Sequence, residues 1–459
     1  MGRKPSDSPI GIRRRWWSLW LLAAALAAVA ILAVACGKEE KKETTPTAAK
    51  TAAAETPEAG TQVIKPSAPL KIGALMSFTG DLGQYGPGIF NGAQLAVKEI
   101  NAAGGVMGKP AELVQADDAT TDSQGVSEAT RLVEVEGVEA IIGALSSGVT
   151  MAVANSVTVP NNVLMISPAS TSPAVSTVAD KDLLFRTTVS DEVQGVALAA
   201  MVKDLGITSI CTMYINNDYG QGLSQVFTKN FEAIGGTVTA EVPHESEQTT
   251  YASELAKCTE GNPEALAAFA YPESSGVFLR EAVEGDLVQQ YIFCDGTKAP
   301  EMFETLGWDV FDGSYGTAAA SAQTEVGPAF EAAYEAEYGK KIELPYQGQA
   351  YDAAYVIALA AEKSLKDNID FRKALRDVSG PPGEIVGPGT EGFARALELI
   401  AAGTDINYEG VSSSIDFDAN GDVFGMIEVW KVDGAAKSLV TDHVVQVDLA
   451  TKKVTEVTP

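Results

Sequence analysis

Histidine and cysteine are the residues that this sequence has least of. It contains 2 His and 4 Cys in 459 residues, and only 33 Lys and Arg against 61 Asp and Glu. So few imidazoles and thiols leave little material for a metal centre or a Ser-His-Asp triad. The formal net charge of −28 would repel a phosphate backbone. We therefore expect no catalytic residues, no metal, no cofactor and no nucleic-acid partner.

The sequence does have enough apolar material to fold. Hydrophobic residues make up 46% of the chain, too many for a disordered protein. The length is sufficient for roughly two or three domains with buried cores.

The N-terminus has the pattern of an export signal. Basic residues dominate the first fifteen positions, and residues 16–35 are apolar except for Ser18. The run ends in Ala33-Val34-Ala35-Cys36-Gly37, which resembles the lipobox of a lipoprotein signal peptide. We predict a signal peptide over residues 1–35 and lipid attachment at Cys36. The alternative is an uncleaved anchor helix, since this run is just long enough to span a bilayer.

In both cases the basic end stays inside and the remaining chain lies outside the cytoplasm, anchored to the outer face of the membrane. Residues 37–69 are rich in Thr, Ala, Pro, Glu and Lys, so we expect a flexible linker over 36–69. Three further cysteines follow, at positions 211, 258 and 294. An oxidising location permits one disulfide among them, but the sequence does not choose the pair.

From Leu70 onward, short apolar runs alternate with helical periodicity. This alternation is typical of βαβ units and parallel sheets, and it restarts near residue 189, which indicates two similar α/β lobes. The predicted strands are 70–77, 111–118, 138–145, 163–168, 209–216, 237–243, 264–271 and 289–296, followed by strand-like segments at 412–418, 424–432 and 443–449. The predicted helices are 90–101, 127–136, 150–157, 191–205, 221–234, 250–258, 275–285, 325–338, 347–365 and 370–378.

Three turns after predicted strands carry small, polar or aromatic residues. They are 145–148, 167–171 and 216–222. Ligands of open α/β sheets bind beyond the carboxyl ends of strands, where hydroxyls and free helix N–H groups suit a carboxylate. Ordinary helix capping and turn chemistry explain any one of these turns equally well.

Several motifs occur in family-like order and spacing. They are IGALMSFTGDLGQYGPGIFNGAQLAVKEINAAGG near the start of the body, then LMISPASTSP, LFRTT, NNDYGQGL and YPES. Over about residues 70–430 the chain resembles the branched-chain amino acid (Leu/Ile/Val) binding proteins of ABC transporters.

This resemblance implies the type I periplasmic-binding-protein fold, in which two Rossmann-like lobes joined by a three-strand hinge close on a ligand. The implied N-terminal lobe is 70–188 plus 318–412, and the C-terminal lobe is 189–317 plus 413–459. The implied function is capture of an amino acid or similar small carboxylate or amide, and its delivery to an ABC permease and ATPase complex.

The same resemblance implies a pocket. Ser147 and Thr171 would hold the ligand carboxylate, with Ser146 beside them, and the Ala169 carbonyl and Thr171 hydroxyl would accept from an α-ammonium. Asp295 would complete the ammonium site in the position where the family often has Glu. Tyr85, Tyr219 and Tyr271 would form the walls. The Leu-binding branch often has a cysteine in the position of Ser146, so its usual disulfide is not expected here.

Two competing functions and one competing motif stay open. The chain has the features of a sensory ligand-binding lipoprotein of the same fold, and Ser147 as a nucleophile would make it an extracytoplasmic hydrolase. Residues 416–422 (DFDANGD) match the first half of an EF-hand loop, but position twelve falls on Ile427, where calcium needs Glu. A hairpin turn at Asn420-Gly421 is the simpler interpretation.

Overall fold

The computed structural model describes residues 63–320 and 326–457, which belong to one contact unit of the chain, Thr61–Pro459. The predicted signal peptide, Cys36 and most of the linker lie outside the described residues. Contacts with the folded body begin before Leu70, because the Ile64 N–H donates to Asp370 Oδ2 (3.0 Å) and the Ile64 carbonyl accepts from the Phe371 N–H (2.9 Å). Within the described residues, no helix is long and apolar enough to cross a membrane.

The first sheet is entirely parallel, with the strand order β2-β1-β3-β4-β5. Its strands are β1 (Lys71–Met76), β2 (Glu112–Asp117), β3 (Ala140–Gly143), β4 (Leu164–Ser167) and β5 (Leu184–Arg186). Every residue of β3 and β4 is buried, as expected for parallel strands that helices cover on both faces. These apolar strands therefore form the core of what we call the first lobe.

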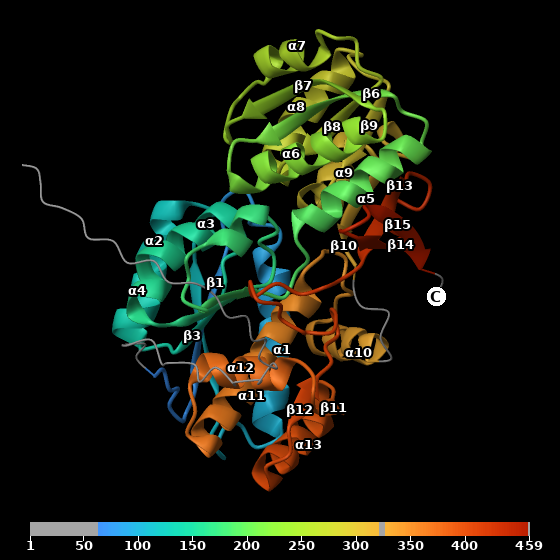
Figure 1. Cartoon of the computed structure of the whole chain (residues 1–459). Coiled ribbons are helices and arrows are strands. Elements are labelled where there is room, and N and C mark those ends of the chain that lie inside the picture. The colour runs from blue at the N-terminus through green and yellow to red at the C-terminus, as the bar shows by residue number, and fades with distance from the viewer. Residues whose placement is uncertain (1–62, 321–325, 458–459) are drawn as a thin grey trace, which may run out of the picture. The chain divides into compact units, whose positions relative to one another are not determined.

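Helices from two distant parts of the chain cover this sheet (Figure 1). The first set is α1 (Gly86–Ala102), α2 (Asp122–Arg131), α3 (Ser147–Val153) and α4 (Val159–Asn161). The second set is α10 (Gly327–Tyr338), α11 (Gln347–Asp367), α12 (Phe371–Ser379) and α13 (Gly389–Ala402), with the short strand pair β11 (Glu384–Val386) and β12 (Ile406–Tyr408). Helix α11 packs against α1 and is buried along most of its length. Helix α13 has no counterpart among the predicted helices.

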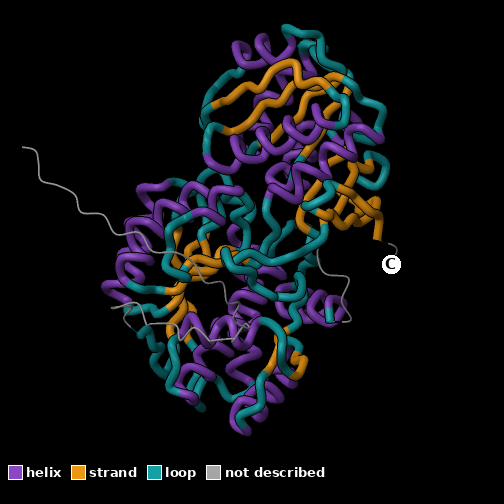
Figure 2. Tube along the Cα trace, viewed as in Figure 1, coloured by secondary structure: helices purple, strands orange, loops and turns teal. Residues whose placement is uncertain are grey.

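The second sheet is mixed, with the order β15-β14-β13-β10-β9-β8-β6-β7. Its parallel part is β6 (Ser209–Ile215), β7 (Thr237–His244), β8 (Ala265–Phe269), β9 (Gln290–Phe293) and β10 (Tyr315–Ala319). Strands β13 (Ile427–Asp433), β14 (Ser438–Asp448) and β15 (Lys453–Val457) extend it in antiparallel fashion. The second lobe also contains α5 (Asp191–Asp204), α6 (Asp218–Ala233), α7 (Ala252–Thr259), α8 (Pro272–Glu284) and α9 (Pro300–Leu306). Figure 2 shows these strands flanked by helices.

The chain passes between the two sheets three times. The first connection is 187–190, the second leaves β10 toward α10, and the third is 409–426, between β12 and β13. The third connection corrects one expectation, because residues 412–418 form a loop and no strand. The backbone N–H of Ser412 donates to the buried Asp352 carboxylate (2.8 Å) instead of to a strand ladder.

One disulfide lies in the second lobe and joins Cys211 of β6 to Cys258 of α7. Cys294, at the end of β9, is a buried free thiol. The structure therefore selects one of the three pairings that the sequence left open.

Candidate functional site

A cavity lies between the two lobes, where loops that follow strands of both sheets meet. Its free volume is about 20 Å³, roughly the room that one water molecule needs, so the lining side chains lie close together. Its lining comprises Leu82, Tyr85, Ile89, Leu145, Ser147, Ala169 and Tyr346 from the first lobe, and Tyr219, Tyr271, Asp295 and Gly296 from the second. Six of the eight predicted ligand residues are in this set. Ser146 and Thr171 are buried and are not among the lining residues.

The first lobe presents hydroxyls and backbone groups to the cavity. Ser147 is the first residue of α3, and its Oγ accepts the N–H of Ser172 (3.2 Å). This bond ties the turn after β3 to the turn after β4. The Thr171 hydroxyl donates to Asp191 Oδ2 (2.9 Å), and the Thr171 carbonyl accepts from the Asp191 N–H (2.8 Å). Both predicted carboxylate-binding turns are therefore held in place by their own hydrogen bonds.

The second lobe presents a carboxylate and aromatic rings. Asp295 Oδ1 accepts from the Tyr219 hydroxyl (2.7 Å) and from Gln194 Nε2 (2.7 Å), and Asp295 Oδ2 accepts from the Tyr346 hydroxyl (2.6 Å). Asp295 thus joins its own lobe to a tyrosine of the other lobe. The rings of Tyr219 and Tyr271 stack, with centroids 5.4 Å apart and planes 4° from parallel.

Two further contacts cross between the lobes around the cavity. The Tyr85 hydroxyl donates to the carbonyls of Asp295 and Gly296, both at 3.1 Å. The Tyr271 hydroxyl donates to Ser146 Oγ (3.4 Å). The three predicted wall tyrosines therefore do more than supply apolar surface, because each also donates a hydrogen bond that involves the other lobe or Asp295.

The sequence reasoning missed three polar side chains that bond Asp295 or Thr171. Asp191 and Gln194 lie in the first turn of α5, where an acid after Ser190 has the pattern of ordinary helix capping. Within the described residues, Asp191 Oδ1 and Gln194 Oε1 are buried without a hydrogen-bond partner. Tyr346 precedes α11 with a left-handed backbone (φ 80°), and no periodicity in the sequence marks it.

Burial shapes the acidity of the two carboxyl groups. It raises the pKa of Asp295, against the lowering effect of hydrogen bonds from Tyr346, Tyr219 and Gln194. Burial raises the pKa of Asp191 well above its usual range, and the nearby charge of Asp295 adds to the rise. Two ionised acids are therefore costly here, and a cationic group bound beside them would stabilise both ionised forms.

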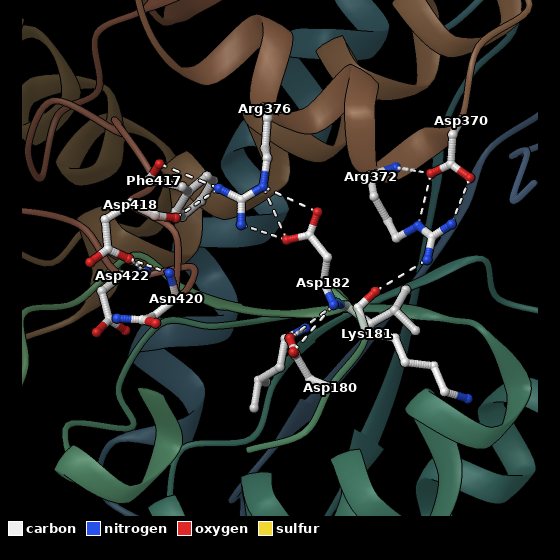
Figure 3. A network of polar contacts seen from close by, with 12 residues as sticks. Asp180, Lys181, Asp182, Asp370, Arg372, Arg376, Phe417, Asp418, Asn420 and Asp422 are labelled. Carbon is white, nitrogen blue, oxygen red and sulfur yellow. Dashed lines mark hydrogen bonds and ion pairs between the residues drawn. The ribbon is translucent and has the colours of Figure 1, made fainter. Parts of the chain in front are cut away.

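The EF-hand-like segment is occupied by bonds within the protein. Asp418 Oδ1 accepts the N–H groups of Asn420 (2.7 Å) and Asp422 (3.0 Å), as Figure 3 shows in part. Gly421 has a left-handed backbone and forms the predicted turn, but no strands flank it, so the hairpin interpretation is wrong. Within residues 63–320 and 326–457, no group of three or more His, Cys, Asp or Glu is placed to hold a metal ion.

Comparison with known proteins gives a consistent result. Residues 69–396 match the model of a family described as periplasmic binding protein. The substrate-binding protein BasB of the chemotactic signal transduction system of Halobacterium salinarum is 26% identical over 364 residues, which is 76% of this chain and 84% of that protein. The Leu/Ile/Val-binding protein BraC3 of Rhizobium johnstonii is 28% identical over 313 residues, 68% of this chain and 84% of that protein.

Among solved structures, the leucine binding protein LivK of Thermotoga maritima superposes with a TM-score of 0.68. It is 26% identical, and the match covers 82% of this chain and 99% of that one.

Proposed function

Because the chain belongs to the periplasmic binding protein family, we propose that it is the solute-binding component of an ABC importer and captures a branched-chain amino acid between its lobes. Membership of this family also implies a place outside the cytoplasm. The lobes would close on the ligand because the closed form makes contacts with it that an open form cannot make. A permease and ATPase complex would then take up the released ligand.

One observation supports an amino acid as the ligand. It is the pair of buried acids, Asp191 and Asp295, beside the turns that bear hydroxyl groups. An α-ammonium has three N–H donors. Asp191 Oδ1 is a buried acceptor without a partner in the described residues, and Asp295 stands next to it as a second acid. A ligand with an ammonium on this side and a carboxylate toward Ser147 and Thr171 would satisfy both groups of side chains.

The remaining lining favours an aliphatic side chain. Leu82, Ile89 and Leu145 supply apolar surface, and the rings of Tyr219 and Tyr271 face the same cavity. Burial of apolar area contributes about 25 cal/mol per Å², so a branched aliphatic group is stabilised here while a charged one is not.

Calorimetric titration with matched ligands tests the proposal. L-Leucine, L-isoleucine and L-valine are expected to bind. 4-Methylpentanoate, which is leucine without its amino group, should bind at least about 100-fold more weakly, since it brings no cation to the two buried acids and leaves Asp191 Oδ1 without a donor. Benzoate and L-glutamate serve as a carboxylate without an ammonium and as an amino acid with a charged side chain. Equal binding of leucine and 4-methylpentanoate would contradict the assignment of the acid pair.

A sensory role is the second candidate, and one observation favours it, since the similar Halobacterium protein belongs to a chemotactic signal transduction system. Both roles use the same ligand chemistry. They differ in what a cell without the protein loses, which is uptake of radiolabelled leucine in the first role and the swimming response to leucine in the second. If a cell without the protein takes up leucine normally but no longer swims in response to it, the protein is a sensor and not an importer component.

The membrane anchor is a separate proposal. We expect Cys36 to carry the lipid, so that Cys36→Ala releases the protein from the membrane fraction and abolishes metabolic labelling with a fatty-acid analogue. If the apolar run stays as an uncleaved helix instead, the variant would remain in the membrane fraction with residues 1–35 still attached.

A further inference from the structure

The turn after β4 is held from behind by a buried arginine. Arg186, the last residue of β5, is 0% exposed. Its Nη1 donates to the carbonyls of Ser170 (3.2 Å) and Ser172 (2.9 Å), on either side of Thr171. Its Nη2 donates to Ser176 Oγ (2.7 Å) and its Nε to Asp422 Oδ1 (2.7 Å). One guanidinium therefore bonds four groups, and two of these are the carbonyls on either side of Thr171.

The bonds to these carbonyls orient the peptide groups of the turn. A trans peptide is planar, so the carbonyl of Ser170 and the N–H of Thr171 point in opposite directions. When Arg186 draws the Ser170 carbonyl toward itself, it turns the Thr171 N–H away from itself. The next peptide is fixed by two other bonds: its Thr171 carbonyl accepts from the Asp191 N–H (2.8 Å), and its Ser172 N–H donates to Ser147 Oγ (3.2 Å). Each peptide of the turn thus has one set direction.

The anchor of Arg186 belongs to a distant part of the chain. Asp422 lies in the third connection between the lobes, and its second oxygen, Oδ2, accepts from the Ser176 hydroxyl (2.7 Å). The backbone repeats the link, because the Arg186 N–H donates to the Gly421 carbonyl (3.0 Å). A Cβ at Gly421 would lie 2.6 Å from the Leu184 carbonyl oxygen, so only glycine permits this approach.

We propose that Arg186 is a positioning residue for ligand binding, and that Arg186, Asp422 and Ser176 form a bracket that holds the turn Ser170–Ser172 in its binding geometry and fastens it to the third connection. None of its three side chains lines the cavity. It acts through Thr171, and it makes the geometry of the turn depend on the connection that the lobes share. The proposal rests on the proposed function, since it assigns the bracket a role in the same ligand site.

A second arginine that bonds the same connection provides a matched control. Arg376 of α12 donates from Nη1 to the Asp418 carbonyl (2.7 Å) and from Nε to Asp182 (3.0 Å), as Figure 3 shows. Its guanidinium also lies over the ring of Phe185, 5.1 Å from the centroid. Arg376 therefore fastens the same connection to the first lobe with an equally extensive set of contacts, and none of these contacts reaches residues 170–172.

The test compares Arg186→Lys, Asp422→Asn and Arg376→Lys in the full-length protein. Hydrogen exchange in the absence of ligand measures the opening of peptides that cover 168–176, and calorimetry measures the affinity for L-leucine. We expect exchange in this segment at least about tenfold faster, and leucine binding at least about tenfold weaker, for the two bracket variants. The double variant Arg186→Lys with Asp422→Asn should lose no more than the larger single loss, because both act through one bracket.

Arg376→Lys should lower the melting temperature while both other readouts stay within twofold of the parent. The proposal is overturned if Arg376→Lys weakens leucine binding as much as Arg186→Lys at the same loss of melting temperature, or if exchange in 168–176 is unchanged in the bracket variants. If the parent protein does not bind L-leucine but the bracket variants accelerate exchange in this segment alone, the bracket stands and the proposed ligand fails.

Discussion

The two walls of the cavity come from lobes of the same α/β type, yet they offer different chemistry. The first lobe contributes neutral groups, the Ser147 hydroxyl and the backbone near Ala169, on turns that hydrogen bonds to one another hold in place. The second contributes the Asp295 carboxylate and the stacked rings of Tyr219 and Tyr271. A buried charge is stable only where several donors converge on it, while a hydroxyl needs only a turn of fixed geometry.

The lobes also differ in covalent stabilisation, and this difference gives the largest expected effect. The disulfide Cys211–Cys258 closes a loop with a sequence separation of 47 residues in the second lobe. Replacing both cysteines with alanine should lower the free energy of unfolding of that lobe by about 4 kcal/mol, measured by urea denaturation. Leucine affinity in the absence of urea should stay within twofold. As a control, reductant should destabilise the parent and leave the double variant unchanged; a response of the variant to reductant would contradict the pairing.

The acidic wall should matter more for affinity than the neutral wall. Asp295→Asn removes a charge that accepts from Tyr219, Tyr346 and Gln194, and we expect a loss of about 2–3 kcal/mol in leucine binding, roughly 100-fold, by calorimetry.

Asp118→Asn is the matched control for this charge. Asp118 is equally buried, accepts from Ser77 Oγ (2.6 Å), and does not line the cavity. It should change stability and leave affinity unaltered. An equal loss of affinity in both variants would mean that any buried acid in this molecule matters as much as Asp295.

The neutral wall should show a smaller effect. Ser147→Ala removes one neutral hydroxyl, whose contribution is about 1 kcal/mol, or roughly fivefold in leucine affinity. Thr130→Val is a suitable control, because the Thr130 hydroxyl lies in α2, donates to the Val126 carbonyl (2.7 Å) and is not part of the cavity lining. A larger loss for Ser147→Ala than for Asp295→Asn would reverse the comparison between the walls.

The smallest effect should appear as a dependence on pH. Since burial raises the pKa of both Asp191 and Asp295, these groups begin to take up protons at a higher pH than ordinary carboxyls. Protonation removes the charge that an ammonium needs, so leucine affinity should fall as the pH is lowered from 7 to 5. The ligand-free protein should change in the opposite direction, because raised pKa values in the folded state mean that folding takes up protons and is favoured as pH falls.

Titrations at several pH values, with thermal melts of the ligand-free protein, check both signs. Asp295→Asn should flatten the two curves, whereas Ser147→Ala should leave their slopes unaltered. An affinity for leucine that rises on acidification would contradict an ammonium bound beside ionised acids.

Much of the fold followed from local patterns. The apolar run in Lys71–Met76 and the helical periodicity of residues 90–101 predicted a βαβ architecture, because both patterns are set by residues within a few positions of one another. Helix α13 was not predicted, and residues 412–418 were predicted as a strand but form a loop. Their sequence alternates like that of a strand, but the N–H groups of Val411 and Ser412 donate to Asp352. That competition is decided by a residue about 60 positions away, which no local window contains.

The site divides in the same way. The family resemblance named six residues that the structure gathers at one cavity, namely Ser147, Ala169, Tyr85, Tyr219, Tyr271 and Asp295. Their contacts with a ligand stay a prediction. Asp191, Gln194 and Tyr346 carried no such signal. They belong to the site because they hydrogen-bond Asp295 or Thr171 in the folded protein.

Composition and short spacings are enough to predict the alternation of strands and helices, the scarcity of His and Cys, and the turns that contain the hydroxyls and tyrosines. Only the tertiary structure decided which cysteines pair, which acids share a buried site and which arginine stands behind the ligand turn. Arg186 and Asp422 are 236 positions apart in the sequence but form an ion pair in the fold. A buried guanidinium without acceptors would be costly, so the fold must supply those acceptors from distant parts of the chain.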